Sequence, residues 1–192
     1  MRSALEESLT PIDLGQLADV ARLRADLDEK AYPTIVRAIE MFRDLDVVPP
    51  TPAKMLGYFG VVESLLSHAP KPNDSADSIA RQLKRNLILL NNRMGGGQKL
   101  GLEEFGDTKH EKVITKLYEY RSAIAHGGDW TAKGDALVKI HDGWDDAPTG
   151  PQKHVFQQSY NAKWPERFLR RLTKRVLVHS MREPKLVVDL KG

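Results

Sequence analysis

Residues 51–66 read TPAKMLGYFGVVESLL and contain the pattern that decides the fold. Their apolar side chains recur every three to four positions, which is the period of one helix face and not the alternation of a strand. These side chains are Met55, Leu56, Phe59, Val62, Leu65 and Leu66. Thr51 precedes the run, Pro70 and Pro72 follow it, and Glu63 is the one acid within it. The stretch therefore predicts a helix that buries a wide apolar stripe.

The same period recurs along most of the chain. The other segments that show it are 13–27, 33–45, 74–90, 108–124, 131–140 and 152–181. We expect Asp13 to cap the first of these helices, Asp74 or Ser75 to open the fourth, and Thr108 to begin the fifth. Because almost every periodic segment is helical, the sequence predicts an all-α helical bundle.

Three segments interrupt this pattern. Trp164 and Pro165 predict a kink or a break inside the last long helix, because proline lacks the N–H that the helix needs. Residues 98–107 are typical of a loop or a partly ordered excursion. Pro184 is expected to end the last helix, and residues 185–190, KLVVDL, predict a short C-terminal strand or extended tail.

Length and composition indicate one ordinary globular domain. The chain has 192 residues, and a domain typically takes roughly 150, so we expect a single helical domain over 1–192 with a helical extension at 1–32. Hydrophobic residues make up 41% and charged residues 29%, which is usual for such domains. The sequence has no cysteine, which excludes disulfides, thiolate metal sites and cysteine nucleophiles.

The sequence predicts a cytoplasmic protein with no membrane contact. No stretch approaches the ~18 uninterrupted apolar residues of a membrane span. The opening MRSALEESLT places acids where a secretory signal needs an apolar run.

Basic residues are concentrated near the C-terminus. Residues 163–192 contain nine basic and three acidic side chains, although the whole chain has a net charge of only +3. At spacings of three and four, several of them line one side of the predicted helix: Lys163, Arg167, Arg170, Arg171, Lys174 and Arg175. Such a face neutralises phosphates, so we expect the five from Arg167 to Arg175 to bind RNA. The alternative is a solvated helix face that binds nothing.

The common catalytic motifs are absent. The sequence has no His-Glu-x-x-His, no Gly-x-Ser-x-Gly and no cluster at metal-ligand spacing, so we expect neither metal nor cofactor. The glycines at 95–97 are not followed by Gly-Lys-Ser/Thr, which argues against a phosphate loop. His68 and His179 lie near predicted helix ends, where a surface position is the usual one.

Residues 117–128, LYEYRSAIAHGG, hold the candidate site. Arg121 and His126 stand near the end of an apolar-striped helix, and small side chains separate them, which leaves room for another chain or a ligand. Five residues turn about 500° around a helix, a net offset of roughly 140°. Arg121 and His126 of one helix therefore point in different directions and cannot easily act on the same group. Two copies related by two-fold symmetry make a better pair of the two side chains.

Arginine and histidine together suit RNA cleavage. A guanidinium stabilises charge on a phosphate, while an imidazole titrates near neutral pH and transfers protons to and from the reacting oxygens. The alternative is structural: Arg121 forms an ion pair with Glu119 or another acid, and His126 only hydrogen-bonds the helix end.

These stretches resemble the HEPN family, and in particular its Apea-like branch. The segment YEYRSAIAHGG is similar to that branch's motif, with Tyr118 upstream of the arginine and glycines behind the histidine. MLGYFGVVESLLSHAP at 55–70 resembles its aromatic helix, and IARQLKRNLILL at 79–90 the helix that follows. The resemblance covers roughly 33–185 and implies a HEPN-like helical bundle there.

The resemblance implies a metal-independent endoribonuclease that acts as a toxin or antiviral defence effector. Arg121 and His126 correspond to its catalytic pair, which homodimers join into one composite site; Ser122, Glu63 and Tyr118 correspond to surrounding positions. Many active members have Asn, Asp or His after the arginine, where this chain has Ser122. Implied partners are RNA, a second copy of the chain, and a neutralising or sensor protein. The alternatives are a catalytically silent dimerisation or docking module and an RNA- or nucleotide-binding protein.

Overall fold

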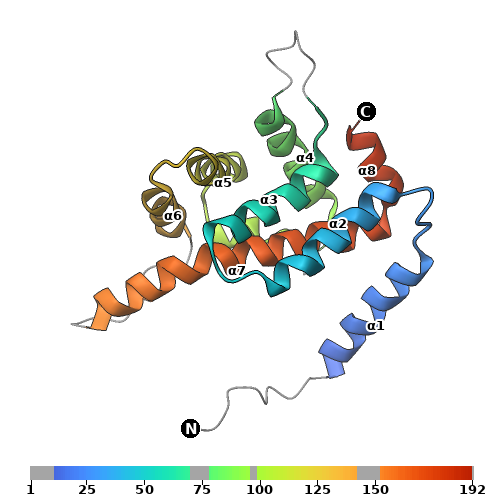
Figure 1. Cartoon of the computed structure of the whole chain (residues 1–192), viewed down its shortest axis with the longest axis horizontal. Helices are drawn as coiled ribbons and strands as arrows, with labels where there is room; N and C mark the ends of the chain where they lie inside the picture. The colour runs from blue at the N-terminus through green and yellow to red at the C-terminus, as the bar shows by residue number, and fades with distance from the viewer. Residues whose placement is uncertain (1–10, 70–77, 96–98, 142–151, 192) are drawn as a thin grey trace.

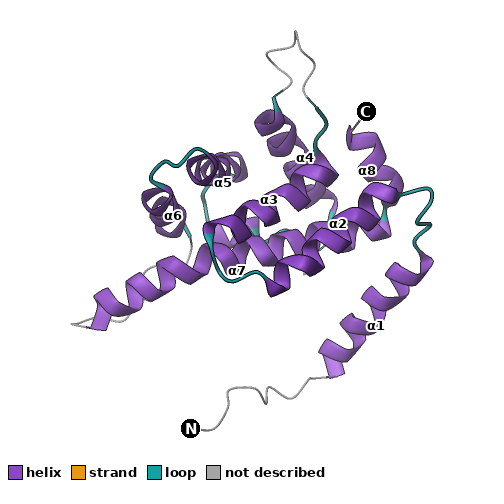
Figure 2. Ribbon diagram, viewed as in Figure 1, coloured by secondary structure: helices purple, strands orange, loops and turns teal. Residues whose placement is uncertain are grey.

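The computed structural model describes residues 11–69, 78–95, 99–141 and 152–191, and in these ranges the chain forms helices and no strands (Figure 2). The predicted all-α fold is therefore confirmed. The helices are α1 (Pro11–Asp26), α2 (Pro33–Asp44), α3 (Pro52–Leu66), α4 (Ile79–Arg93), α5 (His110–Ala125), α6 (Trp130–Lys139), α7 (Gln152–Arg182) and α8 (Pro184–Lys191). Short 3-10 helices, η1 (Leu45–Val47) and η3 (Leu102–Phe105), lie between them.

Helix α3 lies at the centre of the bundle and packs against α2, α4, α5, α7 and α8. The long α7 runs across the bundle behind α2 and α3 (Figure 1). Lys54 on α3 and Glu166 on α7 form an ion pair of 3.5 Å, and both side chains are largely buried. Around them the largest buried side chains form the core: Tyr58, Leu65, Leu66, Leu90, Phe105, Tyr120, Leu137, Phe168 and Leu169. The apolar stripe of α3 is thus the core predicted from its sequence, and it fixes the direction in which Glu63 leaves the helix.

Helices α3 and α4 begin at side-chain caps, whereas α1 and α5 do not begin at the residues predicted to open them. Helix α3 begins as expected, because the Thr51 hydroxyl accepts the Lys54 N–H at 3.4 Å and Pro52 lies in the first turn. Helix α4 begins at Ile79 with Ser78 as its cap. The predicted openers at 74 and 75 lie outside the described residues. Helix α1 begins two residues before the predicted cap Asp13, and α5 begins at His110, two residues after Thr108.

Two segments that were predicted to interrupt the helical pattern are ordered parts of the bundle. Within residues 98–107, η3 buries Leu102 and Phe105, and the Asn91 Oδ1 accepts the Leu100 N–H at 2.8 Å. Helix α7 continues through Pro165 without ending, so of the two predicted alternatives the break is wrong and the kink stays a prediction.

The predicted C-terminal strand or tail is also wrong, because Pro184–Lys191 forms α8. Val187 is buried. The Asn86 side-chain amide donates to the Leu66 carbonyl at 2.7 Å and to the Leu190 carbonyl at 3.2 Å, which attaches α8 to the bundle. Tertiary packing therefore decides a segment whose local pattern was ambiguous.

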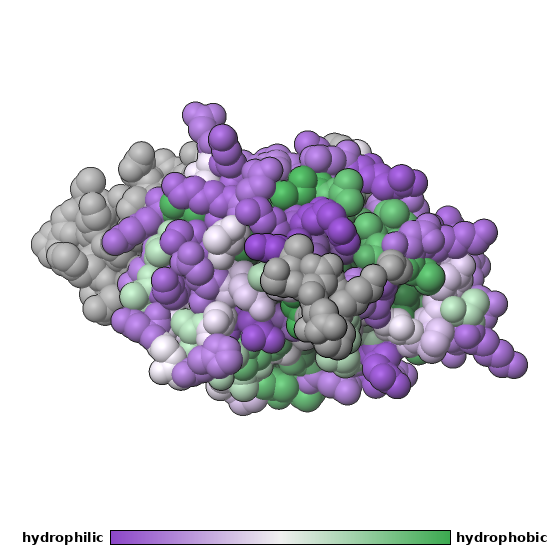
Figure 3. All heavy atoms as spheres, turned by 90° about the horizontal axis from the view of Figure 1, so that it is seen from above, coloured by the Kyte–Doolittle hydropathy of each residue, from purple (hydrophilic) through white to green (hydrophobic). Residues whose placement is uncertain are grey.

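Helix α1 lies at the edge of the molecule (Figure 1). Val20 and Leu23 are half-buried, whereas Leu17 is 65% exposed. Seen from above, the surface is mainly polar, with hydrophobic side chains in separate patches (Figure 3). Among the described helices, none is long and apolar enough to cross a membrane.

Candidate functional site

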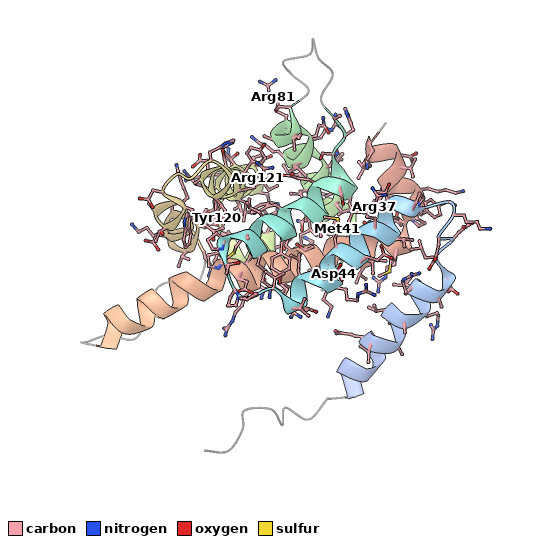
Figure 4. All side chains as sticks on the ribbon, in the orientation of Figure 1. Arg37, Met41, Asp44, Arg81, Tyr120 and Arg121 are labelled. Atoms are coloured by element: carbon pink, nitrogen blue, oxygen red, sulfur yellow. The ribbon has the colours of Figure 1, made fainter. Side chains whose placement is uncertain are left out.

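The Arg121 guanidinium on α5 is held by a carboxylate on α3. Arg121 Nε donates to Glu63 Oε1 at 3.0 Å, and Nη2 donates to Oε2 at 3.3 Å. The side chains are 25% and 17% exposed, so the pair lies at the edge of the core with one side open to solvent. Figure 4 shows Arg121 where α5 approaches α3. Arg121 therefore has a fixed direction.

Tyr118, one turn earlier on α5, lies beside Arg121. The Arg121 guanidinium carbon lies 5.8 Å from the centroid of the Tyr118 ring, a cation–π distance. Tyr120, the residue before Arg121, is buried, and its hydroxyl donates to Met55 Sδ at 3.5 Å. Burial, with a smaller effect of the Glu166 charge, raises the pKa of Tyr120 to about 12, so this hydroxyl stays protonated.

Helix α5 ends at His126 in a glycine-dependent turn. The His126 N–H donates to the Ser122 carbonyl at 3.0 Å, and the Gly128 N–H donates to the Ala123 carbonyl at 2.7 Å. Gly127 has a φ of +68°, a conformation that residues with a side chain rarely adopt. This Schellman-type turn leaves His126 exposed at the end of the helix.

Small residues leave the end of α5 open. Ser122 and Ala123 are half-buried and Ala125 is exposed. Arg121 pairs with Glu63 and not with Glu119, which instead accepts from Lys116 at 3.0 Å and from Lys133 at 3.2 Å. The hydrogen bond from Lys116 lowers the pKa of the Glu119 carboxyl. The end of α5 thus has a bound arginine, an exposed histidine and an accessible surface.

Carboxylates already hold part of the predicted basic face of α7. Arg170 Nη2 lies 3.1 Å from Asp46 Oδ1, and Arg171 donates to Glu104. Arg175 is half-buried against Gly101, where an added Cβ would lie 3.0 Å from its Nη1. Arg167 and Lys174 are exposed, and no carboxylate of the described residues forms an ion pair with either. These two are the more available phosphate contacts.

The basic face and the end of α5 belong to different parts of the bundle. Helices α5 and α7 each pack on α3 and α6 but are not closely packed against one another; α5 also packs on α4, and α7 on α1, α2 and α8. The structure therefore brings Glu63 and Tyr118 to Arg121, but it does not place the basic side chains against it.

A cluster around Glu104 was missed at the sequence level. The Glu104 carboxylate accepts a hydrogen bond from the Arg171 guanidinium. The same carboxylate lies 3.6 Å from His141 Nε2, so it joins two segments that are separate in the sequence. The His141 ring packs 4.6 Å from Trp164, which stacks on Phe168 at 5.2 Å. Only the fold brings these residues together, and no spacing in the sequence indicated it.

His179 is buried, so its predicted surface position is wrong. It is 6% exposed, and its Nε2 lies 3.6 Å from Glu183 Oε1. Burial lowers the pKa of His179; Glu183 opposes this shift, and the charges of Arg93 and Arg182 add to it. The described residues contain no group of three or more side chains able to hold a metal ion.

No protein-family model, curated protein or solved structure matches this chain. The resemblance of the α3, α4 and α5 segments to the HEPN family therefore stays a prediction. The case for a function rests on the residues of the site.

Proposed function

We propose that this protein is a metal-independent endoribonuclease of the HEPN type that acts as a homodimer. The observation that carries the proposal is the two-point contact from Glu63, which fixes Arg121 on the helix whose open end presents His126. A fixed guanidinium can stabilise the charge on a phosphate, and an exposed imidazole can transfer the protons of phosphodiester cleavage in RNA.

The Glu63 contact leaves Arg121 able to bind phosphate. It uses the Nε–H and one N–H of Nη2, so both N–H groups of Nη1 and the second N–H of Nη2 remain. These donors are set in one plane, which suits the oxygens of a phosphate. Because Arg121 is held before the substrate arrives, little ordering is needed in the transition state.

In the proposed reaction the 2′-hydroxyl of RNA attacks the adjacent phosphorus. One His126 accepts the 2′-hydroxyl proton as the O2′–P bond forms. The P–O5′ bond breaks, and the partner subunit's His126 gives a proton to the departing O5′. Arg121 stabilises the negative charge of the five-coordinate phosphorus. Two copies of the end of α5 thus supply both the base and the acid.

The exposed cations of α7, away from the end of α5, suit a polyanionic substrate long enough to reach both. Arg167 and Lys174 would hold RNA by its phosphates away from the reacting bond. We assign the activity to a toxin or antiviral defence effector in the cytoplasm, restrained or triggered by a partner protein.

The Arg121–Glu63 pair also favours a second function. The carboxylate neutralises the guanidinium, and Ser122 stands where many active HEPN proteins have a more polar residue. In this alternative the end of α5 serves dimerisation, docking or RNA binding without cleavage.

Incubation of the purified chain with 5′-labelled single-stranded RNA tests the proposal. We expect cleavage by the wild type and a loss of ~10²-fold or more in His126→Ala and Arg121→Ala, because each removes a positioned catalytic group. Glu119→Gln, on the same helix, is the matched control and should cleave normally. Absence of cleavage by a folded wild-type dimer that still binds RNA would instead establish the silent alternative.

A further inference from the structure

A cavity of about 430 Å³ lies at the other end of the bundle from α6. It is bounded by the residue before α2, the end of α4 and the junction of α7 with α8, and its polar wall consists of Tyr32, Arg93, Arg182, Glu183, Lys185 and Asp189. Its size is within the range of small-molecule sites, roughly 300–1,000 Å³. None of its lining residues belongs to α5.

The charges of the cavity are only partly balanced. Arg93 Nε donates to Glu183 Oε2 at 2.8 Å. Arg182 and Lys185 are exposed, and within the described ranges neither forms an ion pair with a carboxylate. The wall therefore has three cations, Arg93, Arg182 and Lys185, and two carboxylates, Glu183 and Asp189, and Arg182 and Lys185 are the two cations outside the ion pair. Such a pair suits a doubly charged phosphate group.

A buried histidine lies behind the acid of this wall. His179 is 6% exposed, and its Nε2 has no hydrogen-bond partner among the described residues. That nitrogen lies 3.6 Å from Glu183 Oε1, while the other oxygen of Glu183 holds Arg93. Glu183 is therefore held between Arg93 and His179, which leaves Arg182 and Lys185 as the cations available to a ligand.

The remaining polar groups select among phosphorylated ligands. Asp189 lies one helical turn after Lys185 on the same face of α8, and a carboxylate accepts hydrogen bonds from ribose hydroxyls. Tyr32 supplies an aromatic ring, on which a base can stack. We propose that this cavity binds a nucleoside monophosphate, with Arg182 and Lys185 on the phosphate, Asp189 on the ribose and Tyr32 on the base.

Calorimetric titration of the full chain with AMP, adenosine and inorganic phosphate tests the site. AMP should bind more tightly than either fragment. Arg182→Ala and Lys185→Ala should each weaken AMP about tenfold, the usual effect of losing one charge-assisted contact, and Tyr32→Ala should weaken AMP and adenosine alike. Lys139→Ala, an exposed lysine on α6, should bind AMP as the wild type does.

Three results would overturn the inference. The first is that the wild type does not bind AMP. The second is that the Arg182→Ala and Lys185→Ala variants bind AMP as tightly as the wild type does, with unchanged melting temperatures. The third is that inorganic phosphate binds as tightly as AMP. Because the site is separate from α5, His126→Ala should retain AMP binding whether or not the chain cleaves RNA. Loss of AMP binding in that variant would place the ligand at the end of α5 and contradict this site.

Discussion

Arg121 and Glu63, 58 positions apart in the sequence, form a two-point ion pair in which each carboxylate oxygen accepts from a different guanidinium nitrogen. The pair joins α5 to the central helix α3, whose own position is fixed by its buried apolar stripe. The hydrophobic pattern of α3 therefore determines where Arg121 points. We expect this relationship to control activity more than stability.

Glu63→Gln is expected to lower RNA cleavage by about 10²-fold, since a displacement of roughly 1 Å in a catalytic group has an effect of that size. Stability should change by only about 1 kcal/mol, because the pair is partly open to solvent. Single-turnover rates and thermal melts measure the two effects. When Arg121 is already replaced by alanine, adding Glu63→Gln should lower the cleavage rate little further. If the two substitutions lower the rate additively, Glu63 does not act through Arg121.

Arg167→Ala with Lys174→Ala should weaken RNA binding more than Arg170→Ala with Arg171→Ala. The first two side chains are exposed without an ion-pair partner among the described residues, whereas Asp46 and Glu104 hold the second two. Losing two phosphate contacts should lower the slope of log Kd against log salt by about two units.

Fluorescence anisotropy of labelled RNA, with His126→Ala protein to prevent cleavage, measures that slope. An unchanged slope in the first double variant would mean that this helix face is only solvated.

Ala125→Arg is expected to separate the homodimer and abolish cleavage. Ala125 is exposed at the end of α5, beside His126, where the proposed partner approaches. A long charged side chain there leaves a cation unpaired in the contact. Light scattering at micromolar concentration reports the mass. Ala53→Arg, an exposed alanine at the start of α3, is the control and should remain a dimer. A fully active monomer would contradict the composite site.

The sequence correctly predicted features that depend on local periodicity. Its predictions were wrong where contacts between residues far apart in the chain determine the structure. The stripe of α3 is such a local pattern, and it formed as predicted. Helix α8 was missed because its adjacent apolar residues fit a strand as well as a helix, and only Asn86 and the packing of Val187 distinguish them.

Some residues of the candidate sites could likewise be predicted from local sequence, and others could not. Arg121 and His126 could be named from one segment, and Glu63 from its place in another. The Glu104 cluster, the burial of His179 and the cavity beside α8 each combine segments that lie far apart in the chain. No spacing rule applies to such groups, since the tertiary fold alone brings them together.

His179 should make the protein less stable below about pH 6.5. Its pKa is lowered in the folded state by burial, so on acidification the unfolded chain binds the proton first. Stability is therefore retained above the ordinary histidine pKa of 6.5 and decreases as the pH falls from there toward the lowered value. Melting temperatures at about pH 7.5 and 5.5 measure this loss.

His179→Leu should flatten that dependence, because leucine does not titrate. Lys139→Ala, which leaves His179 in place, should show the wild-type slope. Equal slopes in His179→Leu and the wild type would mean that other groups determine the acid sensitivity.

The last prediction concerns the cleavage products. The proposed step uses only Arg121, His126 and the 2′-hydroxyl of the substrate, so the products should carry 2′,3′-cyclic phosphate and 5′-hydroxyl ends. RNA with a single 2′-deoxy or 2′-O-methyl nucleotide at the cleaved position should bind normally and remain intact there, because that nucleotide lacks the attacking group. Cleavage should persist in excess EDTA. Activity that disappears with EDTA and returns with magnesium, or efficient cutting of single-stranded DNA, would contradict this mechanism, since DNA has no 2′-hydroxyl from which His126 can take a proton.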